Sequence, residues 1–277
     1  MFTYIDSIED LSFLNKELLQ KPYLGVDTEF RRTTKDNMRL ALLQINDTEE
    51  IYLVDTVLIN DPQEHASFLF SDSVTKIFHS CKEDIEAVYA WTGQIMVNLF
   101  DTQLADAFLN GHYSIGYQGL VKEKLGITVD KGETRSNWIR RPLRDSQLTY
   151  AASDVEFLIE LYICQKESLL KENKLTWLEE ELRFLSSRIF NPLNIMEDLP
   201  IDLSKGEEKN LLNKFNEIVL CTAVAQKINP TLLFSKKSQK DFLRLTLDIG
   251  LENALDKITN WRSQLIATPI SSLFKGF

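Results

Sequence analysis

Cysteine is scarce in this sequence: Cys81, Cys164 and Cys221 are the three among 277 residues. They lie too far apart to form a Cys-x-x-Cys pair, which argues against a thiolate zinc site or a disulfide framework and favours small buried side chains. Long apolar runs are missing too, because no stretch approaches the roughly 18 residues that a membrane helix needs. The opening MFTYIDSIEDL has neither the basic nor the apolar region of a signal peptide. We therefore expect a cytoplasmic protein with no membrane partner.

Positive charge is in deficit, since 31 Lys and Arg face 41 Asp and Glu and the net charge is −10. A protein that binds nucleic acid usually has a basic footprint, so the overall charge argues against such a partner. The distribution is uneven, however. Residues 1–203 hold 20 Lys and Arg against 34 Asp and Glu, whereas residues 204–277 hold 11 against 7. The acidity therefore belongs to the first part of the chain, and the tail is basic.

Strand-like segments come first in the chain and helical ones follow. Apolar runs rich in β-branched residues predict strands at 23–30, 38–46, 51–55 and 75–80. An amphipathic helix is predicted before them at 7–20, where Ser7 and Asp10 have capping-box spacing. Helical patterns dominate after residue 81, including a nearly continuous stretch from 145 to 173. This order indicates an α/β fold with a mixed sheet.

A break in the pattern divides the chain near residues 191–205, where NPLNIMEDLPIDLSKG contains two prolines, a glycine and clustered turn residues. The length also exceeds that of one average domain. We expect a larger domain over residues 1–195 and a smaller helical one over 196–277.

The segment YLGVDTEF, residues 23–30, places two acids in an otherwise buried strand. Side chains two residues apart on a strand share a face, so Asp27 and Glu29 project side by side. Two like charges in a partly buried setting are costly unless a cation neutralises them. The alternative is that the strand ends near Thr28 and both acids lie in a solvated turn.

Two further acids occur at helix positions. Tyr150 and Asp154 are four residues apart in the long helical stretch, so both lie on one helix face. Asp84 falls in the first turn of a helix that Ser80 could cap. Taken singly, each is explained as well by ordinary surface or helix-dipole roles.

Together these residues resemble the three exonuclease motifs of the DEDD family, in its tyrosine-bearing ribonuclease D branch. The resemblance rests on VDTEF, IFHSCKEDIEAV, NLFDTQLADAFL and SNWIRRPLRDSQLTYAASDVEFL, which occur in order across about residues 1–190. It implies an RNase-H-like exonuclease domain, a mixed sheet with flanking helices, followed by a smaller all-α HRDC-like domain.

The resemblance also implies the chemistry. Asp27, Glu29, Asp84 and Asp154 would hold two divalent ions, Mg²⁺ or Mn²⁺, and Tyr150 would orient or help to deprotonate the attacking water. The reaction would be hydrolysis of an RNA 3′ end with release of nucleoside monophosphates. Carboxylate oxygens are the ligands that hard divalent ions prefer, and two such ions can stabilise both the attacking and the leaving oxygen.

Candidates for substrate contact surround these motifs. A cluster of arginines around one tryptophan precedes the Tyr150 helix; it consists of Arg135, Trp138, Arg140, Arg141 and Arg144. The arginines could contact phosphates and the tryptophan could stack on a base. Salt bridges to neighbouring acids and packing of Trp138 in the core explain the cluster equally well. The resemblance places Thr28 between two ligands, and Tyr117 and Gln118 near the bound 3′ end. His79 is expected to be structural, and Asp101 is expected to cap a helix rather than to bind metal.

The tail from about residue 204 resembles the HRDC-type module that follows the nuclease domain in this family, and the chain has room for one such module. Its candidate phosphate contacts are Lys236, Lys237, Lys240 and Arg244. We expect a 3′-5′ exoribonuclease that acts on tRNA precursors or other structured RNA and needs no obligate protein partner. The alternatives are a DNA or short-oligonucleotide exonuclease on the same scaffold, or a catalytically silent RNA-binding protein.

Overall fold

The structure is a computed structural model that describes residues 2–34, 37–112, 114–129, 132, 136–190 and 203–274. The chain forms two compact units, Met1–Ala105 with Ile115–Lys171 and Asp106–Ser114 with Glu172–Phe277. The predicted domain boundary at residues 195 and 196 lies outside the described residues and stays a prediction.

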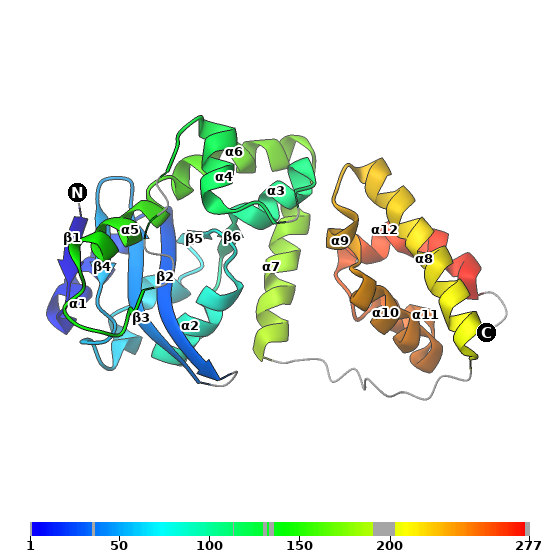
Figure 1. The fold of residues 1–277 in the computed structure, drawn as a ribbon, viewed down its shortest axis with the longest axis horizontal. Helices are drawn as coiled ribbons and strands as arrows, with labels where there is room; N and C mark the ends of the chain where they lie inside the picture. The colour runs from blue at the N-terminus through cyan, green and yellow to red at the C-terminus, as the bar shows by residue number, and fades with distance from the viewer. Residues whose placement is uncertain are drawn as a thin grey trace. The chain divides into compact units, whose positions relative to one another are not determined.

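The first unit is built on one mixed sheet of six strands, in the order β1-β4-β3-β2-β5-β6 (Figure 1). The antiparallel pairs are β2 with β3 and β3 with β4, and the remaining neighbours are parallel. The strands are β1 (Phe2–Ile5), β2 (Tyr23–Thr34), β3 (Asn37–Asn46), β4 (Ile51–Val54), β5 (Thr75–Phe78) and β6 (Leu99–Asp101). The predicted α/β class with a mixed sheet is thus confirmed.

Helices cover both faces of this sheet. On one face α5 contacts β2, β3 and β4 while α6 contacts β2 and β5; on the other, α2 contacts β2 and β3 (Figure 1). The helices that lie wholly in the first unit are α1 (Ile8–Leu18), α2 (Lys82–Thr92), α4 (Tyr117–Leu125), α5 (Asp145–Val155) and α6 (Leu158–Lys171), with short 3₁₀ turns at Pro62–Glu64 and Ser67–Phe70. The predicted cap of α1 is present, since the Ser7 hydroxyl accepts a hydrogen bond from the Asp10 amide at 3.1 Å.

The helix predicted over 145–173 is two helices, because the chain breaks between α5 and α6. The Asn46 side-chain amide donates to the carbonyls of Val155 and Glu156 at 3.0 and 3.1 Å, which satisfies groups that a continuing helix would use. Gly25 lies beneath this break, where an added Cβ would come within 3.2 Å of the Leu158 Cβ. The break therefore lets α6 start directly against β2.

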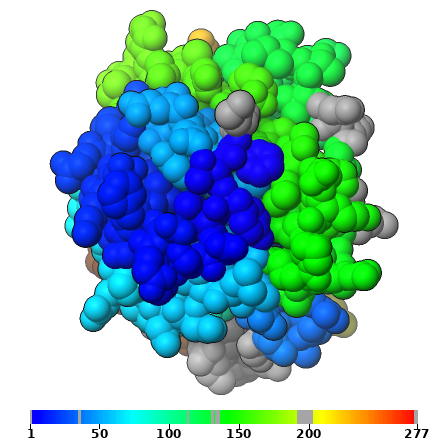
Figure 2. Space-filling model, turned by 90° about the vertical axis from the view of Figure 1, so that its left-hand side faces the viewer, coloured from blue at the N-terminus to red at the C-terminus, as the bar shows by residue number. Residues whose placement is uncertain are grey.

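A hydrophobic cluster joins the edge of the sheet to α5. Ala41, Leu42 and Leu53 from the strands are buried against Leu143 and Ala151. Phe2, Tyr4 and Ile51 pack on its margin. Figure 2 shows this side of the unit, with the blue N-terminal residues adjoining the green surface of the α5 region. The packing fixes α5 on the sheet, and with it the side chains that α5 contributes to the site described below.

The second unit is helical. It holds α7 (Leu175–Phe190), α8 (Lys205–Gln226), α9 (Pro230–Leu233), α10 (Lys236–Ile249), α11 (Leu251–Leu255), α12 (Asn260–Ser271) and a 3₁₀ turn at Ser272–Phe274, and it takes in the end of α3 (Thr102–Asn110). Its core includes three phenylalanines, Phe215, Phe234 and Phe242, whose ring centroids lie 5.2–5.8 Å apart. The sequence EEKNLLNKFNEIVLCTAVAQKI lies almost wholly in α8.

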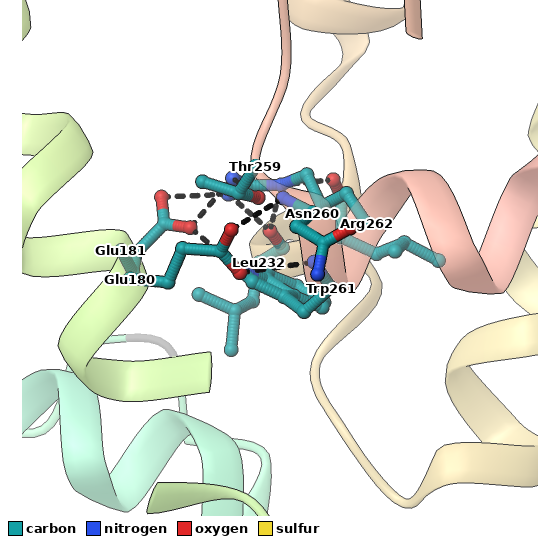
Figure 3. Close-up of polar contacts among 8 residues, drawn as sticks. Glu180, Glu181, Leu232, Thr259, Asn260, Trp261 and Arg262 are labelled. Carbon is teal, nitrogen blue, oxygen red and sulfur yellow. Dashed lines mark hydrogen bonds and ion pairs between the residues drawn. The ribbon is translucent and has the colours of Figure 1, made fainter. Parts of the chain in front are cut away.

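A polar network fixes α12 to α7 within this unit (Figure 3). The Glu180 carboxylate accepts the backbone amides of Asn260 and Trp261 at 2.7 and 3.0 Å, which caps the start of α12. Glu181 receives two guanidinium nitrogens of Arg262 at 2.5 and 2.8 Å. The network is charge-assisted and bidentate, so it holds the two helices in a defined orientation.

The prediction that the cysteines are buried is correct for one of the three. Cys81 is buried, whereas Cys164 on α6 and Cys221 on α8 are exposed because they lie on outward helix faces; all three are free thiols. Within the described ranges, no single helix is long and apolar enough to cross a membrane, although α8 and the segment Pro230–Ile249 pass that test as a pair bent by 115°.

Candidate active site

Three acidic side chains converge above β2. The strand continues to Thr34, so the alternative in which it ends near Thr28 is wrong. Asp27 and Glu29 therefore project from one face of the strand. Asp154 of α5 meets them there, and one carboxylate oxygen from each of the three acids lies within 4.8 Å of the other two. The sequence motifs at positions 27–29 and 150–154 are thus brought together by the packing of α5 on the sheet.

Asp84 joins this group from the opposite side of the strand. It lies in the first turn of α2 with 6% of its surface exposed, and its Oδ1 accepts the Thr28 hydroxyl at 2.5 Å. Its charge contributes to the raised pKa of both Asp27 and Glu29. The structure therefore places all four predicted acids around one point of β2, with the Thr28 hydroxyl bonded to one of them.

The acids are poorly compatible with full ionisation. Burial, followed by the charges of Asp84 and Asp154, raises the pKa of Asp27 well above its usual value. Burial and the same two charges raise the pKa of Glu29 from 4.5 to about 8. Burial also raises the pKa of Asp84 and of Asp154 to about 7. Each raised pKa indicates that the negative charge of the site is not balanced by a nearby positive charge.

The donor set fits hard divalent cations. None of the four acids forms an ion pair with a Lys or Arg of the described residues. The oxygens are carboxylates, which Mg²⁺ and Mn²⁺ prefer, and two dications would balance four negative charges. Asp27, Glu29 and Asp154 are close enough to share an ion, and Asp84 is their neighbour.

Tyr150 lies one helical turn before Asp154 and hydrogen-bonds to it. Burial first, and then the Asp154 charge, raises the pKa of Tyr150 further above its usual value of 10. The ring packs against Trp138 at a centroid distance of 6.2 Å. On another side the backbone at Gly132 comes so close that an added Cβ would overlap the ring. Tyr150 is therefore held as a neutral phenol whose hydroxyl faces the acids.

Two members of the predicted basic and aromatic cluster are used by the fold itself. Trp138 is only 5% exposed and belongs to the hydrophobic cluster beside α5. Arg141 forms an ion pair with the fully buried Asp55 through its Nε and Nη2. Its remaining N–H groups reach the backbone carbonyls of Ala41, Trp138 and Arg140. All five N–H donors of Arg141 thus have protein acceptors, which favours the structural alternative for this residue. Arg135 lies outside the described residues.

Tyr117 is likewise engaged by the backbone. Its hydroxyl donates to the Ser153 carbonyl at 3.2 Å and accepts from the Phe157 amide at 3.0 Å. Gln118 follows it on α4 and is partly buried. His79 packs edge-on against Tyr117 and hydrogen-bonds to Thr102 and to the Ile115 carbonyl, as expected for a structural histidine. Tyr117 therefore supports the backbone around the α5–α6 break, next to Asp154 at the end of α5.

The predicted contacts of the tail lie on another unit. Lys236 and Lys237 are exposed on α10, where Lys236 donates to Asn216 at 2.5 Å and Lys237 pairs with Asp241 at 3.1 Å. Lys240 is exposed on the same helix, while Arg244 is paired with Glu208 at 3.3 Å. Their role in binding substrate stays a prediction.

A protein-family model described as 3′-5′ exonuclease matches residues 2–167, which contain every acid of the site. The chain belongs to the 3′-5′ exonuclease family.

Relatives of this chain include ribonuclease D from Pseudomonas paraeruginosa, 42% identical over 166 residues that cover 60% of this chain and 44% of the relative. The crystal structure of Escherichia coli RNase D superposes with a TM-score of 0.67 at 23% identity, covering 99% of this chain and 74% of that one. Brucella melitensis NrnC with bound Mg²⁺ gives a TM-score of 0.57 at 23% identity, over 73% of this chain and 98% of that one. The resemblance to ribonuclease D is confirmed, although the chain spans about half the length of the curated relatives it matches.

The position of Asp84 depends on a contact that the sequence pattern does not reveal. Ser80 does not cap α2: it has a positive φ of 68°, and Cys81 precedes the helix without a side-chain cap. Asp101 instead accepts the backbone amides of Ser80 and Cys81 at 3.1 and 2.8 Å while capping α3 through the amides of Gln103 and Leu104. The prediction of Asp101 as a helix cap is correct, and the same carboxylate also anchors the turn that leads to Asp84.

Proposed function

We propose that this chain is a metal-dependent 3′-5′ exoribonuclease of the ribonuclease D type, which releases nucleoside 5′-monophosphates from RNA 3′ ends. The observation that carries the proposal is the convergence of the Asp27, Glu29 and Asp154 carboxylates within 4.8 Å, with Asp84 beside them. Family membership supports the direction of hydrolysis, and the ribonuclease D relatives support RNA as the substrate.

In this proposal Asp27, Glu29, Asp84 and Asp154 would hold two divalent ions, Mg²⁺ or Mn²⁺. Bound there, such ions supply the Lewis acidity that activates water and offsets charge on the scissile phosphate. The Mg²⁺ bound by NrnC supports this choice of ion. An acidic active site can in this way accept a phosphodiester, which accounts for RNA as the partner of a protein with a net charge of −10.

Tyr150 acts in the proposal as a hydrogen-bonding group rather than as a base. Its raised pKa keeps the hydroxyl protonated at neutral pH. A neutral phenol that is bonded to Asp154 and fixed between Trp138 and Gly132 can orient the attacking water or a phosphate oxygen. This favours the orienting role over deprotonation, since proton abstraction needs a tyrosinate.

We also propose that residues 1–195 form the exonuclease domain and that 196–277 form a single HRDC-like domain. The basic charge of the tail supports contact with RNA through Lys236 and Lys237. The substrate would be a structured RNA 3′ end, such as that of a tRNA precursor, because Escherichia coli RNase D is described as involved in structured RNA processing. The proposed setting is the cytoplasm, without an obligate protein partner.

A substrate panel tests the proposal. The chain is incubated with 3′-tailed tRNA, single-stranded RNA, DNA and a dinucleotide, in Mg²⁺, Mn²⁺ or EDTA, and products are identified by mass spectrometry. We expect nucleoside 5′-monophosphates from RNA in either metal and none in EDTA, and no release by Asp27→Asn. Glu64→Gln, which removes an exposed carboxylate, should behave as wild type. A preference for DNA or for dinucleotides would favour the alternative exonuclease, and RNA binding without release would favour the silent protein.

A further inference from the structure

The β2–β3 hairpin extends beyond the rest of the sheet. β5 pairs only with residues 23–25 of β2, and β4 pairs only with residues 43–46 of β3. Residues 30–34 and 37–40 therefore form a two-stranded ribbon, and no other strand of the described residues pairs with it (Figure 1). The ribbon is a direct continuation of the strand that carries Asp27 and Glu29.

Arginines face each other across this ribbon. Arg31 and Arg39 are register partners, so their side chains leave the same face of the ribbon. Like charges directly opposite one another destabilise an antiparallel pair. Both arginines are exposed, and the side chain of neither makes a hydrogen bond or ion pair with any residue that the structure describes. Among the described residues, the fold thus supplies no partner for two adjacent guanidinium groups.

The opposite face of the ribbon is neutralised. Arg32 points toward α2, where its Nη2 lies 2.5 Å from Glu86 and 3.5 Å from Glu83. Arg32 thus has two carboxylate partners on α2, whereas the side chain of the neighbouring Arg31 has none among the described residues. Arg31 and Arg39, on the other face, are available to an external anion.

The side chains of Arg31 and Arg39 leave the ribbon on the face of β2 that also carries Asp27 and Glu29. Arg31 follows Glu29 by two residues, so it lies on the same face of β2 about 6.6 Å farther along the strand. The pairing shift after Glu29 adds a residue to β3. Thr28 and Arg32, on either side of the shift, both contact α2, so the alternation of β2 continues through it. A strand whose scissile phosphate lies at Asp27 and Glu29 would bring another phosphate toward the ribbon.

We propose that Arg31 and Arg39 together bind a backbone phosphate of the substrate strand other than the scissile one. This rests on the proposed function and deepens it by assigning a second contact to the same substrate. Paired guanidinium forks suit a phosphodiester because each can donate two parallel hydrogen bonds. The pair would favour longer substrates over a dinucleotide without a 5′-phosphate, since that dinucleotide contains only the scissile phosphate.

The test compares a ten-nucleotide RNA with that dinucleotide in Mg²⁺. For Arg31→Gln/Arg39→Gln we expect KM on the longer RNA to rise by roughly 10- to 100-fold, as for the loss of charge-assisted hydrogen bonds, with kcat little changed. The loss should be confined to the longer substrate, and Arg31→Lys/Arg39→Lys should recover part of it. Lys16→Gln/Lys171→Gln, which removes two exposed charges from α1 and α6, controls for net charge.

A binding measurement separates this proposal from the proposed function. The Kd of a fluorescent ten-nucleotide RNA is titrated with salt in EDTA, where no turnover occurs, and the salt slope should fall by about 1 in the double variant. A Kd and slope equal to wild type would overturn the proposal, as would equal losses on both substrates. Absence of hydrolysis by the wild type, with the Kd difference intact, would overturn only the proposed nuclease activity.

Discussion

Removing the Glu29 charge should stabilise the protein when no metal is present, although it should also inactivate it. Glu29 is destabilising when ionised, because its pKa rises from 4.5 to about 8 through burial and through the charges of Asp154 and Asp84. A pKa displaced by that amount corresponds to at most about 5 kcal/mol at about 1.4 kcal/mol per unit. Because Glu29 keeps partial solvent access, screening reduces the expected gain for Glu29→Gln to about 1–3 kcal/mol.

The sign of the pH dependence follows from the two pKa values. The unfolded carboxyl ionises near pH 4.5, whereas the folded one keeps its proton until about pH 8, so metal-free wild type loses stability as pH rises between those values. Glu29→Gln lacks this loss. Its advantage should be absent below pH 4.5 and largest at pH 8.

Thermal unfolding in EDTA between pH 4.5 and 8 measures the effect. A gain of about 1–3 kcal/mol corresponds to roughly 2–10 °C in the midpoint for a unit of this size. Added Mg²⁺ should raise the wild-type midpoint and shrink the difference, because the ion then offsets the charge. Glu64→Gln is the matched control. A variant that is no more stable than wild type at pH 8 in EDTA would show that these carboxylates do not repel one another.

Three other substitutions separate chemistry from scaffold. Tyr150→Phe should lower kcat by about 10- to 100-fold with little change in Mn²⁺ affinity; an unchanged rate would reduce Tyr150 to a packing residue. Arg141→Ala should cost about 3–5 kcal/mol in urea unfolding because it leaves the buried Asp55 carboxylate without its counter-charge, with hydrogen bonds from Tyr4 and Val57 alone. A fall in RNA affinity without that loss of stability would instead support Arg141 as a substrate contact. Asn46→Ala should cost about 1–2 kcal/mol and lower activity by displacing Asp154, whereas full activity would show that the α5–α6 break does not depend on Asn46.

The elements that could be predicted from sequence are those with a strong local pattern. The strands around 23–30, 38–46, 51–55 and 75–80 and the helix after Ser7 are present because alternation and capping are local signals. β1 and β6 were not predicted, since they have four and three residues and acquire strand geometry from parallel pairing with β4 and β5. The α5–α6 break depends on Asn46, more than a hundred residues away, so no local pattern reveals it.

The site divides in the same way. Asp27, Glu29, Asp84, Tyr150 and Asp154 were identified through residue spacing and a family resemblance, and the fold brings them together. The sequence does not show which arginines are structural and which are candidates for substrate binding, because Arg141 and Arg31 differ in the residues that the fold places beside them. Arg141 meets a buried carboxylate, whereas Arg31 meets another arginine. Those partners are set by register and tertiary packing.

In our proposal the acids at positions 27, 29, 84 and 154 lie together because they hold divalent ions. Crystals soaked in Mn²⁺ and measured at the manganese absorption edge would show this. We expect two anomalous peaks bound by these carboxylates in the wild type and fewer in Asp27→Asn. Well-ordered carboxylates with no anomalous peak among them would contradict it.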